Sequence, residues 1–239
     1  MKWSPSGSKL GVLTKGGSMF QFDPRVLGAI TTGTAHLGPK AQKLAWVDEN
    51  SILTSGFNKQ AEREFSLWDS RNLAEPLSKG NLGDGLGVAH LYFDEQHNLL
   101  FVAGRGEGNI GMYNFVKSDP NPLTFLSNFS GPNPLKGFNF LPKHCLDTNK
   151  HEVNRGVKLS NNGIVEYVSF RLANRTGQFQ DDLYPVFHSN TAASNYGEWA
   201  AGTDKPVLTM QLTEELVQVN HNQKKAMFMA KLGSQTKVV

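Results

Sequence analysis

A bulky aromatic residue followed two positions later by Pro or Asp recurs along this 239-residue chain at nearly constant intervals. The occurrences are 43, 46 and 48 residues apart, and they begin at Trp3, Trp46, Tyr92 and Phe140. After each of the first three comes a short apolar run, and then a run with period-two alternation and an aromatic residue near its end. Four short strands in every unit of about 40 to 45 residues are typical of the blades of a β-propeller.

Propeller blades stack because a single four-stranded sheet cannot cover both of its own faces. We therefore expect the recurring aromatic residues to be buried between blades rather than to stack on a ligand. This prediction covers Trp3, Phe22, Trp46, Trp68, Tyr92, Tyr113 and Phe140. The 24 glycines and 11 prolines also favour many short strands separated by turns over a helical bundle.

The fourth unit, which starts at Phe138, is less regular than the other three. Strands are expected from Glu152 to Leu159 and from Ile164 to Leu172, joined by the turn Asn161-Asn162-Gly163, because Asn and Gly tolerate positive φ. No fourth strand is evident in this unit. The sequence therefore predicts an all-β fold, a partial WD-repeat type of β-propeller with about three and a half to four blades of four-stranded antiparallel sheets over residues 1–172.

Two further segments follow the predicted blades. Residues 173–209 form an extended, turn-rich segment, and we expect Leu183 and Tyr184 to pin this segment to a blade. The tail, residues 210–239, changes to a helical pattern. Thr213 suits the N-cap position, and the sequence predicts a short terminal helix there.

Composition excludes several classes of protein. The formal net charge is only +3, and no block of Lys and Arg resembles a nucleic-acid-binding arm. No apolar run approaches the roughly 18 residues of a membrane span, and the first residues do not resemble a signal peptide. The single cysteine, Cys145, excludes an internal disulfide and a Cys-rich zinc site. We expect a soluble protein in a reducing compartment.

Motifs for catalysis or metal binding are not apparent in the sequence. The stretch Gly104-Arg105-Gly106-Glu107-Gly108 is rich in glycine, but it connects two predicted strands, whereas a phosphate-binding loop leads into a helix. The seven histidines lack the His-x-x-x-His spacing of a helical zinc site. Cys145 has no flanking motif that would make it a nucleophile. We expect no catalytic residue, no metal and no cofactor.

Several long stretches of the sequence resemble one known family. The stretch from Thr54 to Leu73 (TSGFNKQAEREFSLWDSRNL) closely resembles the coronins, the actin-binding WD-repeat proteins, as do Leu100 to Ile110 and Phe140 to Lys143. Phe179 to Pro185 (FQDDLYP) resembles the segment that follows the last blade of the family. The resemblance covers about residues 1–209 and omits the tail.

This resemblance implies a seven-bladed propeller whose C-terminal extension packs along its underside. It also implies binding to filamentous actin and a cytoplasmic, non-enzymatic role in organising the actin cytoskeleton, often with the Arp actin-nucleating complex. The match begins inside the family's propeller, so the N-terminal blades, which carry much of the surface linked to actin binding, are missing, as is the oligomerising C-terminal coiled coil. The chain is expected to be the C-terminal half of a coronin propeller.

Five basic residues in or near predicted loops are candidate contacts for actin, which is acidic. They are Lys59, Arg63, Arg71, Arg105 and Lys117. A solvated surface explains each of them about as well. Glu62 and Glu64 are expected to pair with Arg63, their neighbour in sequence.

Three functional hypotheses remain open. The first is an actin-binding scaffold, the second is a general protein-interaction scaffold whose half-propeller has lost actin affinity, and the third is an enzyme with polar or metal-binding residues converging at the central channel. Both ends of the arc of blades should expose apolar faces, a liability that soluble proteins avoid. We therefore expect a homodimer or other self-association through the open blade edges, or closure of the four blades into a small ring.

Overall fold

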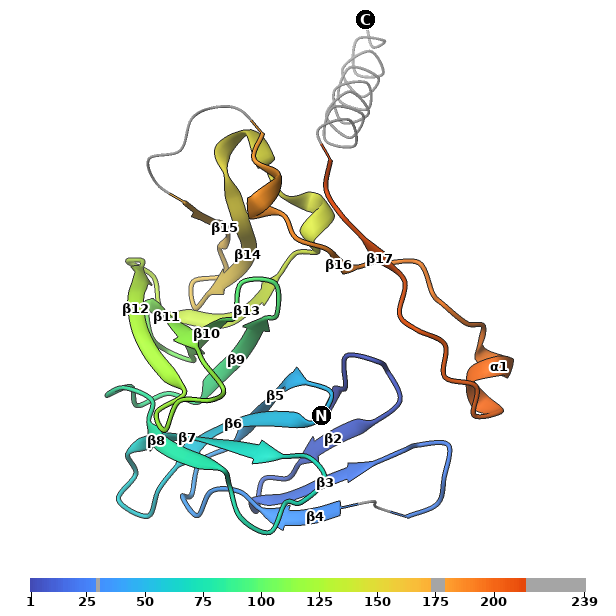
Figure 1. The fold of residues 1–239 in the computed structure, drawn as a ribbon. Coiled ribbons are helices and arrows are strands. Elements are labelled where there is room, and N and C mark those ends of the chain that lie inside the picture. Colours follow the sequence, from blue (N-terminus) through green and yellow to red (C-terminus); the bar gives the residue numbers. More distant parts are fainter. Residues whose placement is uncertain (29–30, 173–178, 214–239) are drawn as a thin grey trace, which may run out of the picture.

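The computed structural model describes residues 1–28, 31–172 and 179–213. Four of its five sheets stand side by side in an arc, and the fifth, which has two strands, belongs to a C-terminal extension that reaches from the last blade to the first (Figure 1). The described chain is nearly all β, which confirms the predicted partial propeller. The helix predicted for the tail falls on residues from 214 onward, outside the described residues.

Each of the first three sheets is an antiparallel blade whose four strands lie in sequence order from the inner edge to the outer edge. Blade 1 consists of β1 (Lys2–Trp3), β2 (Leu10–Leu13), β3 (Ser18–Phe22) and β4 (Thr31–Thr34). Blade 2 consists of β5 (Lys43–Asp48), β6 (Ser51–Phe57), β7 (Arg63–Asp69) and β8 (Ser78–Asn81). Blade 3 consists of β9 (Ala89–Asp94), β10 (Leu99–Gly104), β11 (Asn109–Phe115) and β12 (Leu123–Ser130).

Blade 4 has three strands in the described chain: β13 (Leu135–Phe140), β14 (Glu152–Ser160) and β15 (Val165–Arg171). The two strands predicted here therefore lie within a residue of their expected ends, and no fourth strand of this blade is present among the described residues. Two short 3-10 helices, η1 (Lys143–Cys145) and η2 (Thr148–Lys150), connect β13 to β14. As a result β15 is a sheet edge without a partner strand among the described residues.

Glycine sets the hairpin turns that the sequence indicated. Gly163 has φ +83 in the turn between β14 and β15, where its N–H donates to Ser160 O at 3.0 Å. The glycine-rich stretch between β10 and β11 is likewise a tight inter-strand turn, with Gly106 at φ +84. This left-handed backbone region suits glycine because glycine has no Cβ to clash with the neighbouring peptide.

Aromatic and aliphatic side chains fill the three interfaces between neighbouring blades. Trp46 and Trp68 are buried with Met19 between blades 1 and 2. Phe101 and Phe138 are buried between blades 3 and 4. Between blades 2 and 3 the buried residues are mostly aliphatic, and they include Leu53, Phe65, Leu67, Leu91, Leu100 and Val102. Stacking of blades thus removes one or both faces of each sheet from water.

Trp3 does not follow the predicted burial. Half of its surface is exposed (50%), and its ring packs edge-on against Trp199 of the C-terminal extension, with centroids 6.0 Å apart. The reason is that no other sheet of the described chain packs on the outer face of blade 1. The other predicted aromatic residues that are not fully buried are half-buried, namely Phe22, Tyr92, Tyr113 and Phe140.

A buried hydrogen-bond chain ties the loop before blade 2 to that blade. The indole N–H of Trp68 donates to Thr54 Oγ1 at 2.9 Å, and Thr54 Oγ1 lies 2.9 Å from His36 Nε2. On the other side of the ring, His36 Nδ1 lies 2.7 Å from Glu64 Oε1. Burial lowers the pKa of His36 and outweighs the opposite effect of Glu64, so the ring is neutral at pH 7. These hydrogen bonds stabilise blade 2, and they leave none of the four side chains free to act as a catalytic group.

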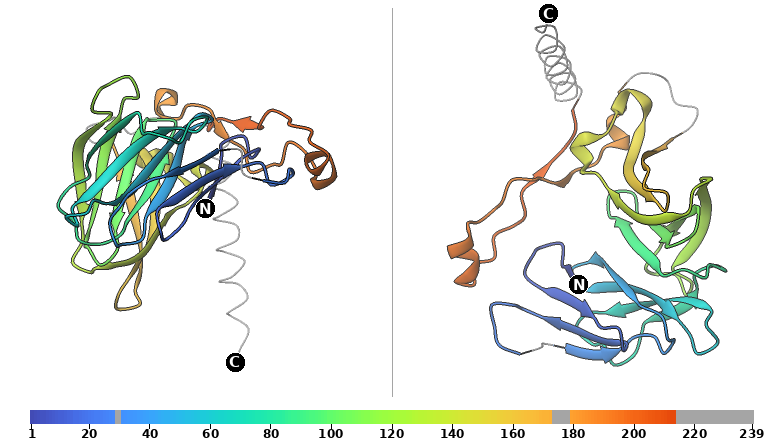
Figure 2. Two further views of the ribbon diagram at one scale, coloured as in Figure 1. Left: turned by 90° about the horizontal axis from the view of Figure 1, so that it is seen from below. Right: turned by 180° about the vertical axis from the view of Figure 1, so that it is seen from behind.

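The C-terminal extension contains η3 (Asp181–Leu183), β16 (Phe187–His188), α1 (Tyr196–Ala200) and β17 (Thr209–Met210). Leu183 and Tyr184 are buried against Leu146 of blade 4, as predicted for the pinning residues. At its far end the extension reaches blade 1, as the view from behind in Figure 2 also shows. There Arg25 Nη1 donates to Asp204 Oδ1 at 2.7 Å, and the indole N–H of Trp199 donates to Gly7 O at 3.3 Å. The extension therefore bridges the first and last blades.

Candidate functional site on the concave face

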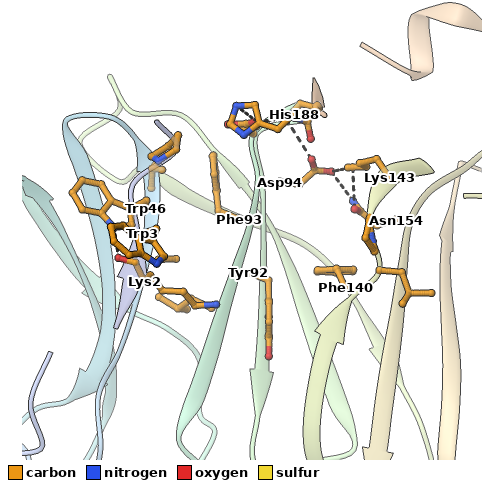
Figure 3. Close-up of a pocket in the computed structure, with 18 residues that line it drawn as sticks. Lys2, Trp3, Trp46, Tyr92, Phe93, Asp94, Phe140, Lys143, Asn154 and His188 are labelled. Carbon is orange, nitrogen blue, oxygen red and sulfur yellow. Dashed lines mark hydrogen bonds and ion pairs between the residues drawn. The ribbon is translucent and has the colours of Figure 1, made fainter. Parts of the chain in front are cut away.

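The inner strands β1, β5, β9 and β13 line an open hollow of about 390 Å³ on the concave side of the arc (Figure 3). Its apolar wall consists of aromatic side chains, which are Trp3, Trp46, Tyr92, Phe93 and Phe140. The Tyr92 ring meets that of Phe140 edge-on at 5.7 Å, and its hydroxyl donates to Phe138 O. Blades 3 and 4 thereby hold the centre of this wall in place.

A buried carboxylate network lies at one end of the hollow (Figure 3). Asp94 Oδ2 accepts hydrogen bonds from Lys143 Nζ at 2.7 Å and from Asn154 Nδ2 at 2.6 Å, and it lies 2.9 Å from His97 Nδ1. Burial would raise the pKa of Asp94, but these partners outweigh burial and hold the pKa at about 2. Asp94 is therefore ionised at neutral pH and joins blade 3 to blade 4.

The same network anchors the extension. His97 Nε2 lies 3.1 Å from Leu183 O, and His188 Nε2 lies 3.4 Å from Glu95 Oε1. Because Asp94 and Leu183 contact opposite nitrogens of one ring, the position of the extension depends on the packing of blade 3. Lys143 also donates to Val153 O at 2.9 Å, so its three protons all point to protein oxygens. The network is saturated and has a structural role.

The strands divide the surface of the arc into two opposite rims. We call the edge that contacts the extension the extension rim, and it carries residues 4–9, 69–77, 95–98 and 116–122. The opposite edge, the distal rim, carries residues 14–17, 58–62, 82–88, 105–108 and 161–163. Because successive antiparallel strands run in opposite directions, consecutive turns alternate between the rims.

This alternation separates the five basic residues singled out in the sequence. Lys59, Arg63 and Arg105 lie at the distal rim, whereas Arg71 and Lys117 lie at the extension rim. Arg71 Nη2 pairs with Asp69 at 2.6 Å, and Lys117 Nζ pairs with Asp48 at 2.8 Å. Lys59 and Arg105 are exposed and make no ion pair within the described chain. The five residues do not form one patch.

Arg63 is buried, with 6% of its surface exposed. Its guanidinium pairs with Glu107 in the glycine-rich turn of blade 3 and donates to Gly87 O at 2.7 Å. The expected partners bond elsewhere, because Glu62 accepts from Asn58 Nδ2 and Glu64 contacts His36. Arg63 therefore joins blades 2 and 3 and is not presented to a partner.

Sequence reasoning missed the Asp94 network and the pair between Arg63 and Glu107. Asp94 was visible as the acidic residue of the recurring aromatic motif, and Lys143 lies in one of the stretches that resemble coronins. Their pairing was not visible, because 49 residues separate them and only blade stacking brings them together. Within residues 1–28, 31–172 and 179–213, no group of three or more His, Cys, Asp or Glu side chains could hold a metal ion. None of the helices described is long and apolar enough to cross a membrane.

Comparison with known proteins shows which proteins this chain is similar to. Residues 165–207 match the model of a type of WD40 repeat. The chain is 32% identical to Coronin-A of Dictyostelium discoideum over 211 residues, which are 88% of this chain and 47% of that protein. It is 30% identical to Coronin-2B of Xenopus tropicalis over 242 residues, covering 100% of this chain and 49% of that protein.

A solved structure is similar as well. The crystal structure of the WD40 domain from Toxoplasma gondii coronin superposes with a TM-score of 0.82 at 28% sequence identity, covering 88% of this chain and 55% of the other. The stacked four-stranded blades and these matches define a WD-repeat β-propeller protein. More particularly, the chain is a coronin-type WD-repeat protein. It spans about half or less of the length of the coronins it matches.

Proposed function

We propose that this chain binds filamentous actin and organises the actin cytoskeleton in the cytoplasm, acting by binding and not by catalysis. The observation that supports this proposal most is the similarity to coronins over 88% of the chain, in sequence and in fold. Cooperation with the Arp actin-nucleating complex is part of the same proposal, since the family resemblance implies it.

The distal rim is the better candidate for the actin contact. Lys59 and Arg105 are exposed there without a carboxylate partner in the described chain, so their charges are available to an acidic surface. At the extension rim, in contrast, Asp69 and Asp48 already neutralise Arg71 and Lys117. Arg63 contributes indirectly by holding the turn that carries Arg105.

Co-sedimentation with actin filaments tests this assignment. Charge reversal in Lys59→Glu/Arg105→Glu is expected to weaken binding by about tenfold, whereas the matched control Arg71→Glu/Lys117→Glu changes it by less than about twofold. The reverse pattern would place the contact on the extension rim. If the wild-type chain fails to pellet with filaments at low salt, actin binding by this chain is rejected.

A second proposal concerns self-association. Blade 4 turns an apolar face away from the arc, with Val165 58% and Tyr167 72% exposed and Val157 and Leu159 half-buried beside them. The outer face of blade 1 is also apolar, with half-buried cross-strand pairs, which are Leu10 with Phe22 and Val12 with Phe20. In an interior pair of blades, faces of these two kinds pack on each other. Blade 4 of one copy can therefore stack on blade 1 of a second copy, and blade 4 of the second copy on blade 1 of the first, so that all the open faces are covered.

Sedimentation velocity over a range of protein concentrations tests the second proposal independently of actin. The wild-type chain is expected to dimerise, and Tyr167→Lys is expected to weaken the dimer by at least about tenfold. The matched control is Leu86→Lys, which places the same charge on a residue that is 77% exposed in the turn between β8 and β9, away from both faces. A stable monomer for the wild-type chain, or equal effects of the two variants, would reject the dimer.

A further inference from the structure

Four basic side chains lie on or next to the inner strands, toward the distal end of the concave face. Lys2 is on β1, Lys43 begins β5, and His90 is on β9. Arg105 follows β10, and it is placed next to β9 because its backbone N–H donates to Val88 O at 3.0 Å. In the sheet His90 pairs with Ala103, so Arg105 lies two residues further toward the distal rim, opposite Val88. Blades 1 and 2 thus contribute one basic group each, and blade 3 contributes two.

These charges have no acidic counterpart in the described chain. No carboxylate of residues 1–28, 31–172 or 179–213 lies within ion-pair distance of Lys2, Lys43 or Arg105. Lys2 and Arg105 are exposed, and Lys43 and His90 are half-buried, so all four are open to solvent. Burial lowers the pKa of His90, and the charges of Lys43, Arg105 and Lys2 lower it further. The field at this end of the concave face is therefore positive.

The basic cluster is continuous with the aromatic hollow. Lys2 Nζ lies 5.8 Å from the centroid of the Tyr92 ring and points toward it from the opposite wall (Figure 3). Trp3, Phe93 and Phe140 line the rest of the hollow around Tyr92. A ligand that lies along the inner strands therefore meets an apolar, aromatic wall first and three full positive charges next.

We propose that the concave face binds an extended acidic peptide, with an aromatic or large aliphatic side chain in the hollow and the following Asp or Glu residues on Lys2, Lys43 and Arg105. An apolar wall beside a short basic row fits a peptide better than a nucleic acid, because only a peptide of this kind offers carboxylates and an apolar side chain within a few residues. This proposal does not rest on actin binding, but it shares Arg105 with the proposed actin contact. The Asp94 network supports such a site, because it fixes the relative position of blades 3 and 4, which line the hollow.

Fluorescence anisotropy of the full chain with a labelled synthetic peptide tests the proposal. The probe carries one Trp followed by three Asp residues, and two further peptides replace the Trp by Ser or the three Asp by Lys. We expect the Trp–Asp peptide to bind at least about tenfold more tightly than either altered peptide. Binding should weaken with added salt, because salt screens exposed charges over roughly 10 Å at 0.1 M.

Variants then locate the site. Lys2→Gln/Lys43→Gln is expected to weaken binding of the Trp–Asp peptide by about tenfold. The matched control Lys15→Gln/Lys59→Gln removes the same charge from two exposed turns at the distal rim and should leave binding within about twofold. Equal losses in the two variants, no preference for the Trp peptide over the Ser peptide, or equally tight binding of a single-stranded oligonucleotide would overturn the proposal. Far-ultraviolet circular dichroism confirms that each variant is folded, so a loss of binding is a loss of contact.

Discussion

Replacement of Asp94 by Asn tests the account of blade stacking most directly. The carboxylate is 6% exposed and accepts bonds from Lys143 and Asn154, and its pKa falls from the usual 3.8 to about 2. A shift of this size corresponds to about 2 kcal/mol of stability from the ionised form. Asn keeps the shape of the side chain but leaves the half-buried Lys143 ammonium without its counter-ion. We therefore expect Asp94→Asn to lower the free energy of unfolding at pH 7 by about 3 kcal/mol.

Urea denaturation at several pH values measures this effect. A group whose pKa is depressed in the folded state stabilises the protein above its unfolded pKa, and this contribution is lost as pH falls through the folded pKa. The wild-type chain should therefore lose the Asp94 contribution between about pH 4 and pH 2, and the difference from Asp94→Asn should shrink over the same interval. The double variant Asp94→Asn/Lys143→Met should be more stable than the sum of the single effects predicts, because it removes both charges.

Asp84→Asn serves as the control, since Asp84 is exposed in the turn between β8 and β9 and should change stability by less than about 0.5 kcal/mol. The reasoning is refuted if Asp94→Asn is as stable as this control at pH 7. It is also refuted if the effects of the Asp94 and Lys143 substitutions are additive, because the two groups would then not interact.

Three further predictions concern the contacts between blades and extension. Trp68→Phe keeps most of the buried ring but removes the N–H donated to Thr54, so the free energy of unfolding in urea should fall by about 1 kcal/mol; an unchanged value would mean that the hydrogen-bond chain contributes nothing. Arg63→Met removes the donor to Gly87 O and leaves Glu107 with only the Gly87 N–H, so it should cost about 3 kcal/mol by the same measurement, whereas a neutral result would show that the pair is dispensable. Trp199→Ala removes the contacts with Trp3 and Gly7, so limited proteolysis should cut residues 189–205 faster than in the wild-type chain while the blades unfold at nearly the same urea concentration. Equal cleavage rates would show that the extension is held elsewhere.

The C-terminal extension links the two end blades of the open arc. Its buried cluster is on blade 4, and its far end contacts blade 1 through Arg25, Asp204 and Trp199. The Arg25 guanidinium lies 5.4 Å from the Trp199 ring and also pairs with Asp23. Because the extension contacts both end blades, it limits the opening of the arc. It does not cover the concave face, so the aromatic hollow stays accessible to a peptide.

The sequence by itself determined the number and kind of modules. The aromatic motif recurs at the period of one blade because each blade must bury its faces against its neighbours, and that requirement repeats locally in the chain. For the same reason the sequence located the turn at Asn161-Asn162-Gly163 and the pinning residues Leu183 and Tyr184. Local periodicity and turn chemistry depend on near neighbours in the chain, which a single sequence displays in full.

Only the tertiary structure decided which charged side chains pair and which surfaces remain exposed. Proximity in sequence predicted Glu62 and Glu64 as the partners of Arg63, yet Arg63 pairs with Glu107 of the next blade, 44 residues away. Basic residues that look alike in sequence lie on opposite rims, since each strand reverses the direction of the chain. Which ionic groups meet, and which faces remain open to a partner, follows from how blades are stacked and oriented. A local pattern of hydrophobicity does not encode that information.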